Sequence, residues 1–183
     1  MDPITTLMDE HQAILAMCDV AAKEAARLRA GGAFEAGRID GMLDFIRNFA
    51  DRCHHLKEED LLFTRMAERG FPVESGPIGV MRHEHEVGRS HVRALAEATP
   101  RAAAGQTAAI KAVADNLAGW SELLKAHIYK EDNILYPMAR QALTAQDLAD
   151  LEAGFAKVER EAIGEGVHER YHAFVHDLAA QLG

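Results

Sequence analysis

The chain has 183 residues, of which 48% are hydrophobic, so it is long enough to bury one sizeable core without disulfide or zinc cross-links. It carries 29 acidic against 20 basic side chains, a net charge of -9. This balance argues against a nucleic-acid partner or an anionic membrane surface, because both require a positive patch. Ten histidines accompany only 6% aromatic residues. Histidine commonly serves as a metal ligand or acid–base group, so these residues are the first candidates for a functional site.

The two cysteines, Cys18 and Cys53, form neither a C-x-x-C pair nor the framework of a small secreted domain. We expect both to be free, buried thiols. The first residues lack a basic segment followed by an apolar one, and nowhere do the roughly 18 consecutive apolar residues of a membrane-spanning helix occur. The sequence therefore predicts a cytoplasmic protein with no membrane partner.

Glycine and proline are sparse and clustered, and they separate long segments rich in Ala, Leu, Glu and Arg. This composition is typical of helices. We predict helices at 3–30, 36–69, 76–98 and 106–141, and a fifth unit at 145–181 that breaks at Gly164. Thr144 and Asp147 have the spacing of a capping box at the start of the fifth unit. The expected organisation is a four-helix domain over 1–141 with a C-terminal helical extension over 142–183.

Apolar positions recur at alternating steps of three and four, as in the helices of a bundle. In the first segment they are Ile4, Met8, His11, Leu15, Cys18, Ala22 and Ala25, and in the fourth Leu117, Trp120, Leu124, His127, Glu131, Ile134 and Met138. His127 and Glu131 take positions where the pattern calls for leucine. Burying them without partners would cost roughly 2–7 kcal/mol for a neutral polar group and far more for an ion. A metal ion is the simplest compensation, and Trp120 and Met138 are expected to pack beside it.

An internal repeat relates the second and fourth segments. Residues 54–63 align without gaps with residues 127–136 and share the pattern H-x-x-K-E-[ED]-x-x-L-aromatic. Upstream, the dipeptide Glu-His occurs at 10–11 and again at 84–85. The bundle is therefore predicted to consist of two copies of a helical hairpin.

Each hairpin supplies one histidine from its first helix and a His-x-x-x-Glu pair from its second. Residues four apart on a helix differ by about 40°, so each pair faces one side. Pseudo-two-fold symmetry would bring six side chains to one volume: His11, His54, Glu58, His85, His127 and Glu131. Imidazole and carboxylate suit iron, manganese or zinc, and carboxylates can bridge two ions. Oxide, hydroxide or another carboxylate is expected to complete the charge balance, with open positions left for a small ligand.

On these residues the sequence resembles the hemerythrin-like HHE cation-binding domains. The resemblance rests on E-H at 10–11 and 84–85, H-H-x-K-E-E at 54–59 and H-x-x-x-E at 127–131. It implies an all-α, up-down-up-down four-helix bundle with a non-haem centre of two iron ions. It also implies that the six side chains are the ligands, and that the partner is a small diatomic molecule, dioxygen or nitric oxide, or peroxide.

Two positions bear on the comparison with oxygen-carrying hemerythrins. Those proteins place a second histidine four residues after the one on the third helix, where this chain has Arg89. They also follow the fourth-helix histidine with an aspartate five positions on, which here is Asp132, although Glu131 fits the repeat better. The departure at Arg89 makes a reversible oxygen carrier the less secure form of the function.

Binding, sensing or storage of the small molecule is the first hypothesis. The second is a di-iron oxidoreductase that turns over peroxide or nitric oxide, or a protein that delivers iron for iron–sulfur cluster repair, so whether the chain is an enzyme stays open. A third is a helical interaction module without metal, whose buried polar residues pair with one another.

The second helix carries two adjacent histidines, and the apolar positions around them place the buried face on the His54 side. We therefore favour His54 with Glu58 as ligands over His55 with Glu59. The disfavoured pair is expected in solvent or in contact with the ligands, and Asp132 is a further candidate for such contact. Glu10 and Glu84 are expected at the surface, with contact to the ligands as the alternative.

The remaining histidines are expected outside the site. His83 and His91 lie on other faces of their helix and are predicted at the surface. His168, His172 and His176 form a row, and the first part of it spells the H-E-x-x-H zinc-protease pattern. We reject a protease because no third ligand follows at a family spacing. His168 is nearest the apolar stripe of its helix and is kept as a candidate to cap the metal site.

Overall fold

The computed structural model describes residues 2–164 and 167–182, and within them the chain is helical, with no strand. The first helix of the bundle is α1 (Pro3–Arg29), which begins where the Asp2 carboxylate accepts from the backbone N–H groups of Ile4 and Thr5. The predicted all-α fold is confirmed.

The other three helices of the bundle are also long, and the second and fourth are composite. The second consists of α2 (Ala36–Phe45), η1 (Ile46–His55), η2 (Lys57–Leu62) and α3 (Phe63–Glu68), the third of α4 (Gly76–Ala103), and the fourth of α5 (Thr107–Lys130), η3 (Glu131–Leu135) and α6 (Tyr136–Ala142). The η segments are π-helical turns. π-Turns inside α-helices are uncommon and concentrate at functional sites.

The third helix extends past its predicted end at residue 98. It continues through Pro100 to Ala103 because a proline in the last turn removes only one hydrogen bond, while Ala98 and Ala102 bury their side chains in the core. The helix ends where Gly105, at φ +81°, lets the backbone N–H of Gln106 bond the carbonyl of Arg101.

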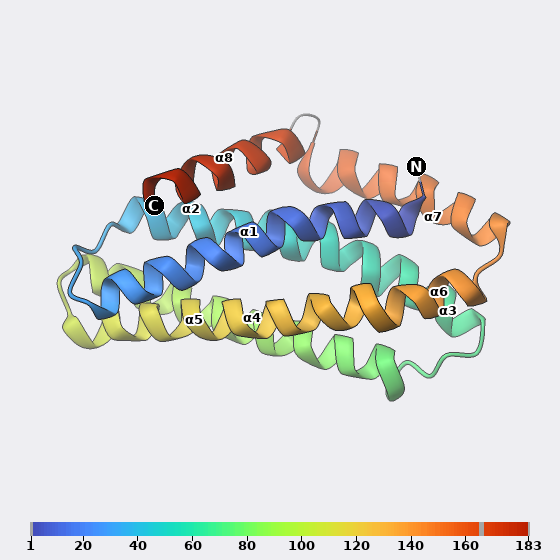
Figure 1. Cartoon of the computed structure of the whole chain (residues 1–183), viewed down its shortest axis with the longest axis horizontal. Helices are drawn as coiled ribbons and strands as arrows, with labels where there is room; N and C mark the ends of the chain where they lie inside the picture. Colours follow the sequence, from blue (N-terminus) through green and yellow to red (C-terminus); the bar gives the residue numbers. More distant parts are fainter. Residues whose placement is uncertain (1, 165–166, 183) are drawn as a thin grey trace.

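The four long helices run alternately in opposite directions, as Figure 1 shows. Helix α5 packs against both α1 and α4, and α2 packs against α4. This is the up-down-up-down arrangement that the sequence predicts for a bundle joined by short loops.

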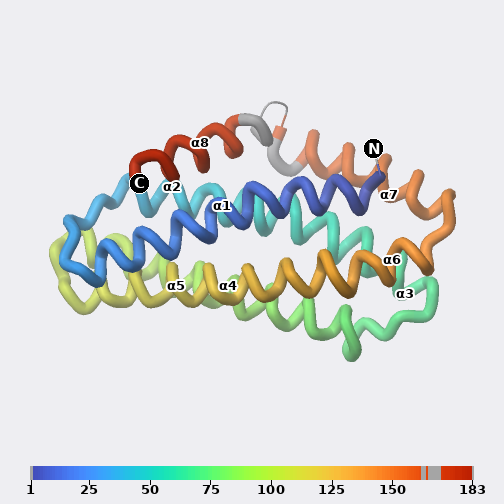
Figure 2. Tube along the Cα trace, in the orientation of Figure 1, coloured from blue at the N-terminus to red at the C-terminus, as the bar shows by residue number. Residues whose placement is uncertain are grey.

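The C-terminal extension comprises α7 (Ala145–Val158), η4 (Glu159–Ile163) and α8 (Val167–Leu182). The predicted capping box opens α7, with Thr144 and Asp147 each bonding the other's backbone. The break at Gly164, which has φ +84°, also falls where predicted. The extension lies along the side of the bundle formed by α1 and the second helix, which Figure 2 traces.

Two apolar clusters fill the bundle, one toward each end. The larger includes Ile14, Phe45, Leu117 and Trp120, and the smaller includes Ile4, Leu62, Leu135, Tyr136 and Phe155. The polar residues described below lie between the two clusters, and η1, η2 and η3 carry several of them. In the described residues, no helix is long and apolar enough to cross a membrane.

The apolar pattern of the fourth helix shifts at η3. The predicted positions Ile134 and Met138 are not buried, and Ile134 is 49% exposed. Leu135, Tyr136 and Ala139 are buried in their place. A π-turn contains more residues than an α-turn, so every side chain after Glu131 is displaced around the helix. Tyr136 thereby enters the core next to the polar residues.

Candidate metal centre

The six side chains predicted as ligands lie together in the middle of the bundle, contributed by all four long helices. Each is at most 2% exposed: His11, His54, Glu58, His85, His127 and Glu131. We call these six residues the histidine–glutamate cluster. Together with His55 they form two groups of candidate ligand atoms, and within each group the atoms lie within 4.8 Å of one another. One group is His11, His54, Glu58 and Glu131, and the other is His55, Glu58, His85 and His127.

The histidines are arranged in two pairs, one in each hairpin. The Nε2 atoms of His11 and His54 lie 3.0 Å apart, and those of His85 and His127 also lie 3.0 Å apart. Two nitrogen ligands at about 2.1 Å from one ion and at right angles to each other are about 3.0 Å apart. Each pair therefore has the spacing of two ligands of a single ion.

The two glutamates lie between the pairs. Glu131 directs Oε2 to Nε2 of His11 at 3.2 Å and Oε1 to Nε2 of His127 at 3.0 Å, so its carboxylate reaches both pairs. Glu58 uses one oxygen, Oε2, which lies 3.6 Å from Nε2 of His54 and 3.4 Å from Nε2 of His85. Its other oxygen, Oε1, accepts a 2.7 Å hydrogen bond from the hydroxyl of Tyr136.

The outer nitrogen, Nδ1, of every histidine in the cluster contacts a carboxylate. Oε2 of Glu10 lies 2.9 Å from Nδ1 of His54, and Oε2 of Glu84 lies 2.9 Å from Nδ1 of His127. Each of these contacts joins the two helices of one hairpin. Asp132 holds His11 at 2.8 Å and Glu59 holds His85 at 2.6 Å, each across the two hairpins. Such carboxylates fix the ring orientation and place the ring proton on Nδ1. Each Nε2 then presents a lone pair to the interior of the cluster.

Two lone pairs 3.0 Å apart repel each other, so the arrangement favours a cation between them. The pKa values agree in direction. Burial lowers the pKa of His11, but Asp132 and Glu131 outweigh burial and raise it to about 10. Burial also opposes the charged form of His85 and His127, yet the facing carboxylates raise the pKa of both. The interior therefore attracts positive charge, which a proton or a metal ion can supply.

Buried carboxylate oxygens favour a metal ion over a proton as the source of this positive charge. Oε2 of Glu58 and both carboxylate oxygens of Glu131 are buried and form no hydrogen bond of good geometry, although those of Glu131 face Nε2 of His11 and of His127. Burial would raise the pKa of Glu131, but His127 and His11 hold it well below its ordinary range, so the group stays ionised. Buried unpaired carboxylate oxygens are costly unless they bind a cation. With four imidazole nitrogens they form the mixed donor set of iron, manganese and zinc sites.

Two lysines at matching positions of the repeat extend the network. Lys57 donates to Glu10 and, at 2.7 Å, to Glu159 of η4, and its ammonium lies 5.6 Å from the Phe155 ring centre. Lys130 donates to Glu84. Lys57 is fully buried, whereas the side chain of Lys130 is 31% exposed, because the C-terminal extension covers only the first of them.

The aromatic residue that ends each repeat packs on a histidine of the cluster. The Phe63 ring stacks on His85 at 6.0 Å between centroids, and the Tyr136 ring stacks on His11 at 5.5 Å. The two differ only in the hydroxyl, which Tyr136 donates to Glu58.

The predictions for residues at the margin of the site have three different outcomes. Glu59 and Asp132 contact the outer nitrogens of two histidines, as the sequence allows. His55 is buried beside the cluster, in one of the two groups of candidate ligand atoms. The side chain of His168 lies outside the described residues, so its prediction stays open.

The expectation that Glu10 and Glu84 lie at the surface is wrong. Glu10 is buried and Glu84 is largely covered, because each reaches between a histidine and a lysine of the neighbouring helix. The repeat contained the signal, since the E-H dipeptide and the lysine before the glutamate occur in both copies. A charged residue conserved between the two copies at a fixed distance from a candidate ligand is a candidate partner of that ligand.

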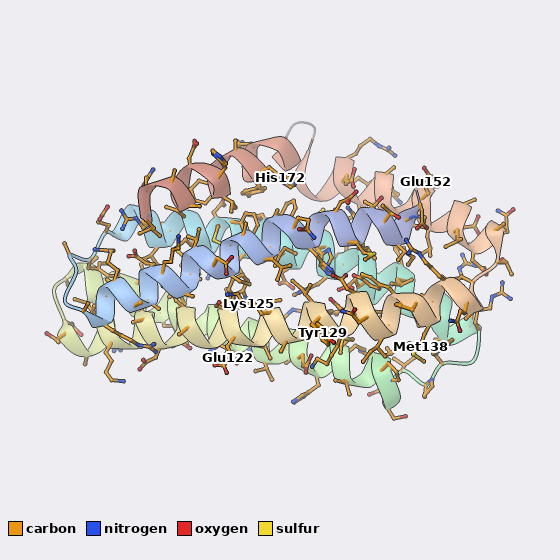
Figure 3. All side chains as sticks on the ribbon, viewed as in Figure 1. Glu122, Lys125, Tyr129, Met138, Glu152 and His172 are labelled. Carbon is orange, nitrogen blue, oxygen red and sulfur yellow. The ribbon has the colours of Figure 1, made fainter. Side chains whose placement is uncertain are left out.

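The other histidines and the cysteines mostly follow expectation. His83 is exposed, while His91 is half-buried and bonds Asn116. His172 of α8, labelled in Figure 3, contacts the ring of Phe49 in η1. Both cysteines are free and buried, and burial raises the pKa of Cys53 to about 12, so this thiol is unreactive at neutral pH.

A cavity of about 200 Å³ opens beside the histidine pair of the second hairpin, His85 and His127. Its lining includes Trp120 and Val92 on the apolar side and Asp51, His55 and Arg89 on the polar side. Because His55 stacks on His85 with ring centroids 3.9 Å apart, the cavity ends next to the cluster.

Comparisons with known proteins agree with this geometry. The sequence profile of the Hemerythrin HHE cation binding domain matches residues 2–139. The chain is 25% identical over 184 residues to the uncharacterized proteins Rv1995 of Mycobacterium tuberculosis (strain H37Rv) and Mb2018 of Mycobacterium bovis, an alignment that covers 99% of this chain and 71% of each relative. No solved structure gives a significant match. The chain belongs to the hemerythrin HHE cation-binding family.

Proposed function

We propose that this protein is a hemerythrin-like non-haem di-iron protein that binds or senses dioxygen, nitric oxide or a related small molecule. Its ligands are the six residues of the histidine–glutamate cluster. The observation that carries the proposal is the pair of inward-facing Nε2 contacts at 3.0 Å, with buried and unpaired carboxylate oxygens of Glu58 and Glu131 between them. Bound iron would supply a Lewis-acidic centre that can change its oxidation state and bind the small molecule.

The chain's own residues prepare the site in three ways. The outer carboxylates hold each imidazole with Nε2 inward. The two glutamates offset part of the positive charge of two ions and span the gap between the histidine pairs. The apolar clusters on either side exclude water, which strengthens every electrostatic interaction inside.

The test combines elemental analysis with a visible spectrum recorded under nitrogen and then under air or nitric oxide. We expect about two iron ions per chain, as in other carboxylate-bridged bundle sites, and a spectrum that changes reversibly with the gas. The Glu58→Ala, Glu131→Ala double variant should lose both, whereas His91→Ala, which alters a histidine remote from the cluster, should retain both. Fewer than about one ion per chain in the iron-supplemented wild type contradicts a metal centre.

The cavity beside His55 favours a second candidate, a di-iron oxidoreductase acting on peroxide or nitric oxide, because it brings small molecules to one side of the cluster. Iron-dependent consumption of either compound that disappears in Glu58→Ala would support turnover. A protein that binds the gas reversibly and consumes neither compound is a binding or sensing protein.

A further inference from the structure

The cavity beside the second histidine pair has features that the metal centre does not account for. Its volume is about 200 Å³, and it lies between η1, α4 and α5, which supply its lining residues. An apolar cavity of about 150 Å³ is large enough to bind benzene. This cavity therefore has room for a molecule of one ring, or a chain of similar size, that carries one or two polar groups.

The lining divides into a buried apolar part and an exposed basic part. Ile46, Ala50 and Trp120 are each at most 3% exposed and form the inner wall. Arg47 and Arg93 are exposed and therefore lie on the solvent side. Apolar walls with a small number of polar groups are typical of sites for small molecules.

Trp120 supplies an unpaired hydrogen-bond donor to the inner wall. The side chain is 3% exposed, and its indole N–H donates to none of the residues that the structure describes. The nitrogen is not sealed in the core, as the carboxylate oxygens of Glu58 and Glu131 are, so it opens to the cavity that Trp120 lines. Buried indole N–H groups usually have a partner. An oxygen atom of a molecule in the cavity can be that partner.

Arg47 supplies an unpaired cation to the outer part. The other two arginines of the lining are occupied, since Arg89 pairs with two carboxylates and Arg93 donates to Glu86 at 2.7 Å. Arg47 pairs with no carboxylate in the part of the chain that the structure describes. The whole chain has a net charge of -9, so an unpaired arginine at a cavity is a local attraction for an anion. The guanidinium fork fits a carboxylate especially well.

We propose that this cavity binds a small carboxylate whose apolar body carries a second oxygen atom, such as a hydroxy-substituted aromatic acid. The carboxylate pairs with Arg47 at the opening, and the body packs on Ile46 and Ala50. The second oxygen accepts from the indole N–H of Trp120. This site is separate from the proposed metal centre and requires no metal ion.

The test uses three probes: 4-hydroxybenzoate, benzoate, which lacks the second oxygen, and phenol, which lacks the carboxylate. Trp120 is the only tryptophan of the chain, so the protein has a single indole N–H resonance, and NMR titration of the metal-free protein follows it directly. We expect this resonance to shift and saturate with 4-hydroxybenzoate at a Kd on the order of 1 mM. Benzoate and phenol should each bind at least about threefold more weakly.

Two variants test the two polar contacts. Arg47→Gln should weaken 4-hydroxybenzoate about two- to fivefold, whereas Arg52→Gln, the same change at an exposed residue of η1 outside the cavity, should not. Trp120→Phe keeps an aromatic ring but removes the donor, so it should abolish the advantage of 4-hydroxybenzoate over benzoate. In that variant the backbone N–H of Gly88, which also lines the cavity, reports binding.

Equal affinities for the three probes, or no saturable shift up to about 20 mM, would overturn the proposal. Equal losses in Arg47→Gln and Arg52→Gln would overturn the contact with Arg47. Binding that appears only after Zn²⁺ is added and is unchanged in Arg47→Gln would place the carboxylate on the metal centre instead of in the cavity. If Trp120→Phe does not fold, the exposed pair Arg47→Gln and Arg52→Gln still decides. Chelator competition for Zn²⁺ tests the metal centre separately, so the two proposals can fail independently.

Discussion

At the scale of single residues, the carboxylate on the outer nitrogen is the contact that organises the cluster. It selects the tautomer, directs the lone pair of Nε2 inward and limits ring rotation, so one acidic residue sets the chemistry of one histidine. Two of these acids come from the same hairpin as their histidine and two come from the opposite hairpin. The cross-hairpin acids therefore also determine how the two halves fit together.

The first prediction concerns those cross-hairpin acids. Glu59→Ala and Asp132→Ala should each lower the affinity for Zn²⁺ or Fe²⁺ by about 10–100-fold, because the freed imidazole loses its orientation and part of its basicity. Chelator competition followed by elemental analysis measures the change. Glu86→Ala, which removes an exposed carboxylate that pairs with Arg93, should change nothing. Equal affinities in all four proteins would refute the role of the outer carboxylates.

The second prediction is a pH dependence. Burial raises the pKa of Glu10, but the hydrogen bond from His54 and the charge of Lys57 outweigh it and lower the pKa from 4.5 to about 2. A carboxyl group with a lowered pKa stabilises the fold above its unfolded pKa and loses that contribution as the pH falls from 4.5 toward 2. The loss has a slope of about 1.4 kcal/mol per pH unit and totals on the order of 3 kcal/mol.

Urea unfolding of the metal-free protein between pH 6 and pH 3 measures this contribution. The free energy of unfolding of the wild type should fall more steeply below about pH 4.5 than that of Glu10→Gln, which has no proton to gain at this position. Parallel profiles for the two proteins would show that Glu10 is not held as an ion in the folded state.

At the scale of elements, the periodicity predicts the helices and their faces well up to the π-turns. Glycine, proline and the three-and-four spacing place the helix boundaries at the loops except at the end of the third helix, which continues through Pro100. The repeat is sufficient to find the six clustered residues. The displacement after Glu131 could not be predicted, because hydropathy does not distinguish a π-turn from an α-turn. As a result the burial of Ile134 and Met138 is predicted wrongly and the position of Tyr136 is missed.

The burial of Glu10 on α1 and of Lys57 on η2 was missed for a different reason. Glu10 and Lys57 are covered by α7 and η4, elements that lie more than 80 residues further along the chain. A pattern within one helix can indicate one buried face, but it does not reveal that a distant segment covers another. Only the matching lysine and glutamate of the two repeats pointed to the network.

The third prediction tests what the extension contributes. Lys57→Met removes the cation from the fully buried Glu10 and should lower the free energy of unfolding by on the order of 3 kcal/mol. Lys130→Met, the same change at the matching position of the repeat, should cost less than about 1 kcal/mol, because the pair there is partly exposed to solvent. Denaturant unfolding gives both values, and equal losses would mean that α7 and η4 do not create a buried environment for Lys57.

At the scale of the whole molecule, the histidine–glutamate cluster forms a polar layer between two apolar clusters, and all four long helices contribute to it. Ions bound in this layer would add direct links between helices that already meet through packing and through the carboxylate–histidine contacts. Because the six donors are brought together only in the folded chain, metal binding should be coupled to folding.

The fourth prediction follows from this coupling. A ligand at 100 times its dissociation constant stabilises the folded state by about 2.7 kcal/mol, so two ions should contribute about 5 kcal/mol. For a chain of this size, 1 kcal/mol raises Tm by about 2–4 °C, which gives a total of roughly 10–20 °C. Thermal unfolding of the metal-free protein with and without added Zn²⁺ measures the shift. Glu131→Ala should lose most of it, because Glu131 reaches both histidine pairs, while Glu86→Ala should keep it. A wild-type Tm that stays within about 2 °C on adding the ion would mean that the polar layer is held together by its own hydrogen bonds and ion pairs, and that the carboxylate oxygens between the histidines are not ligands.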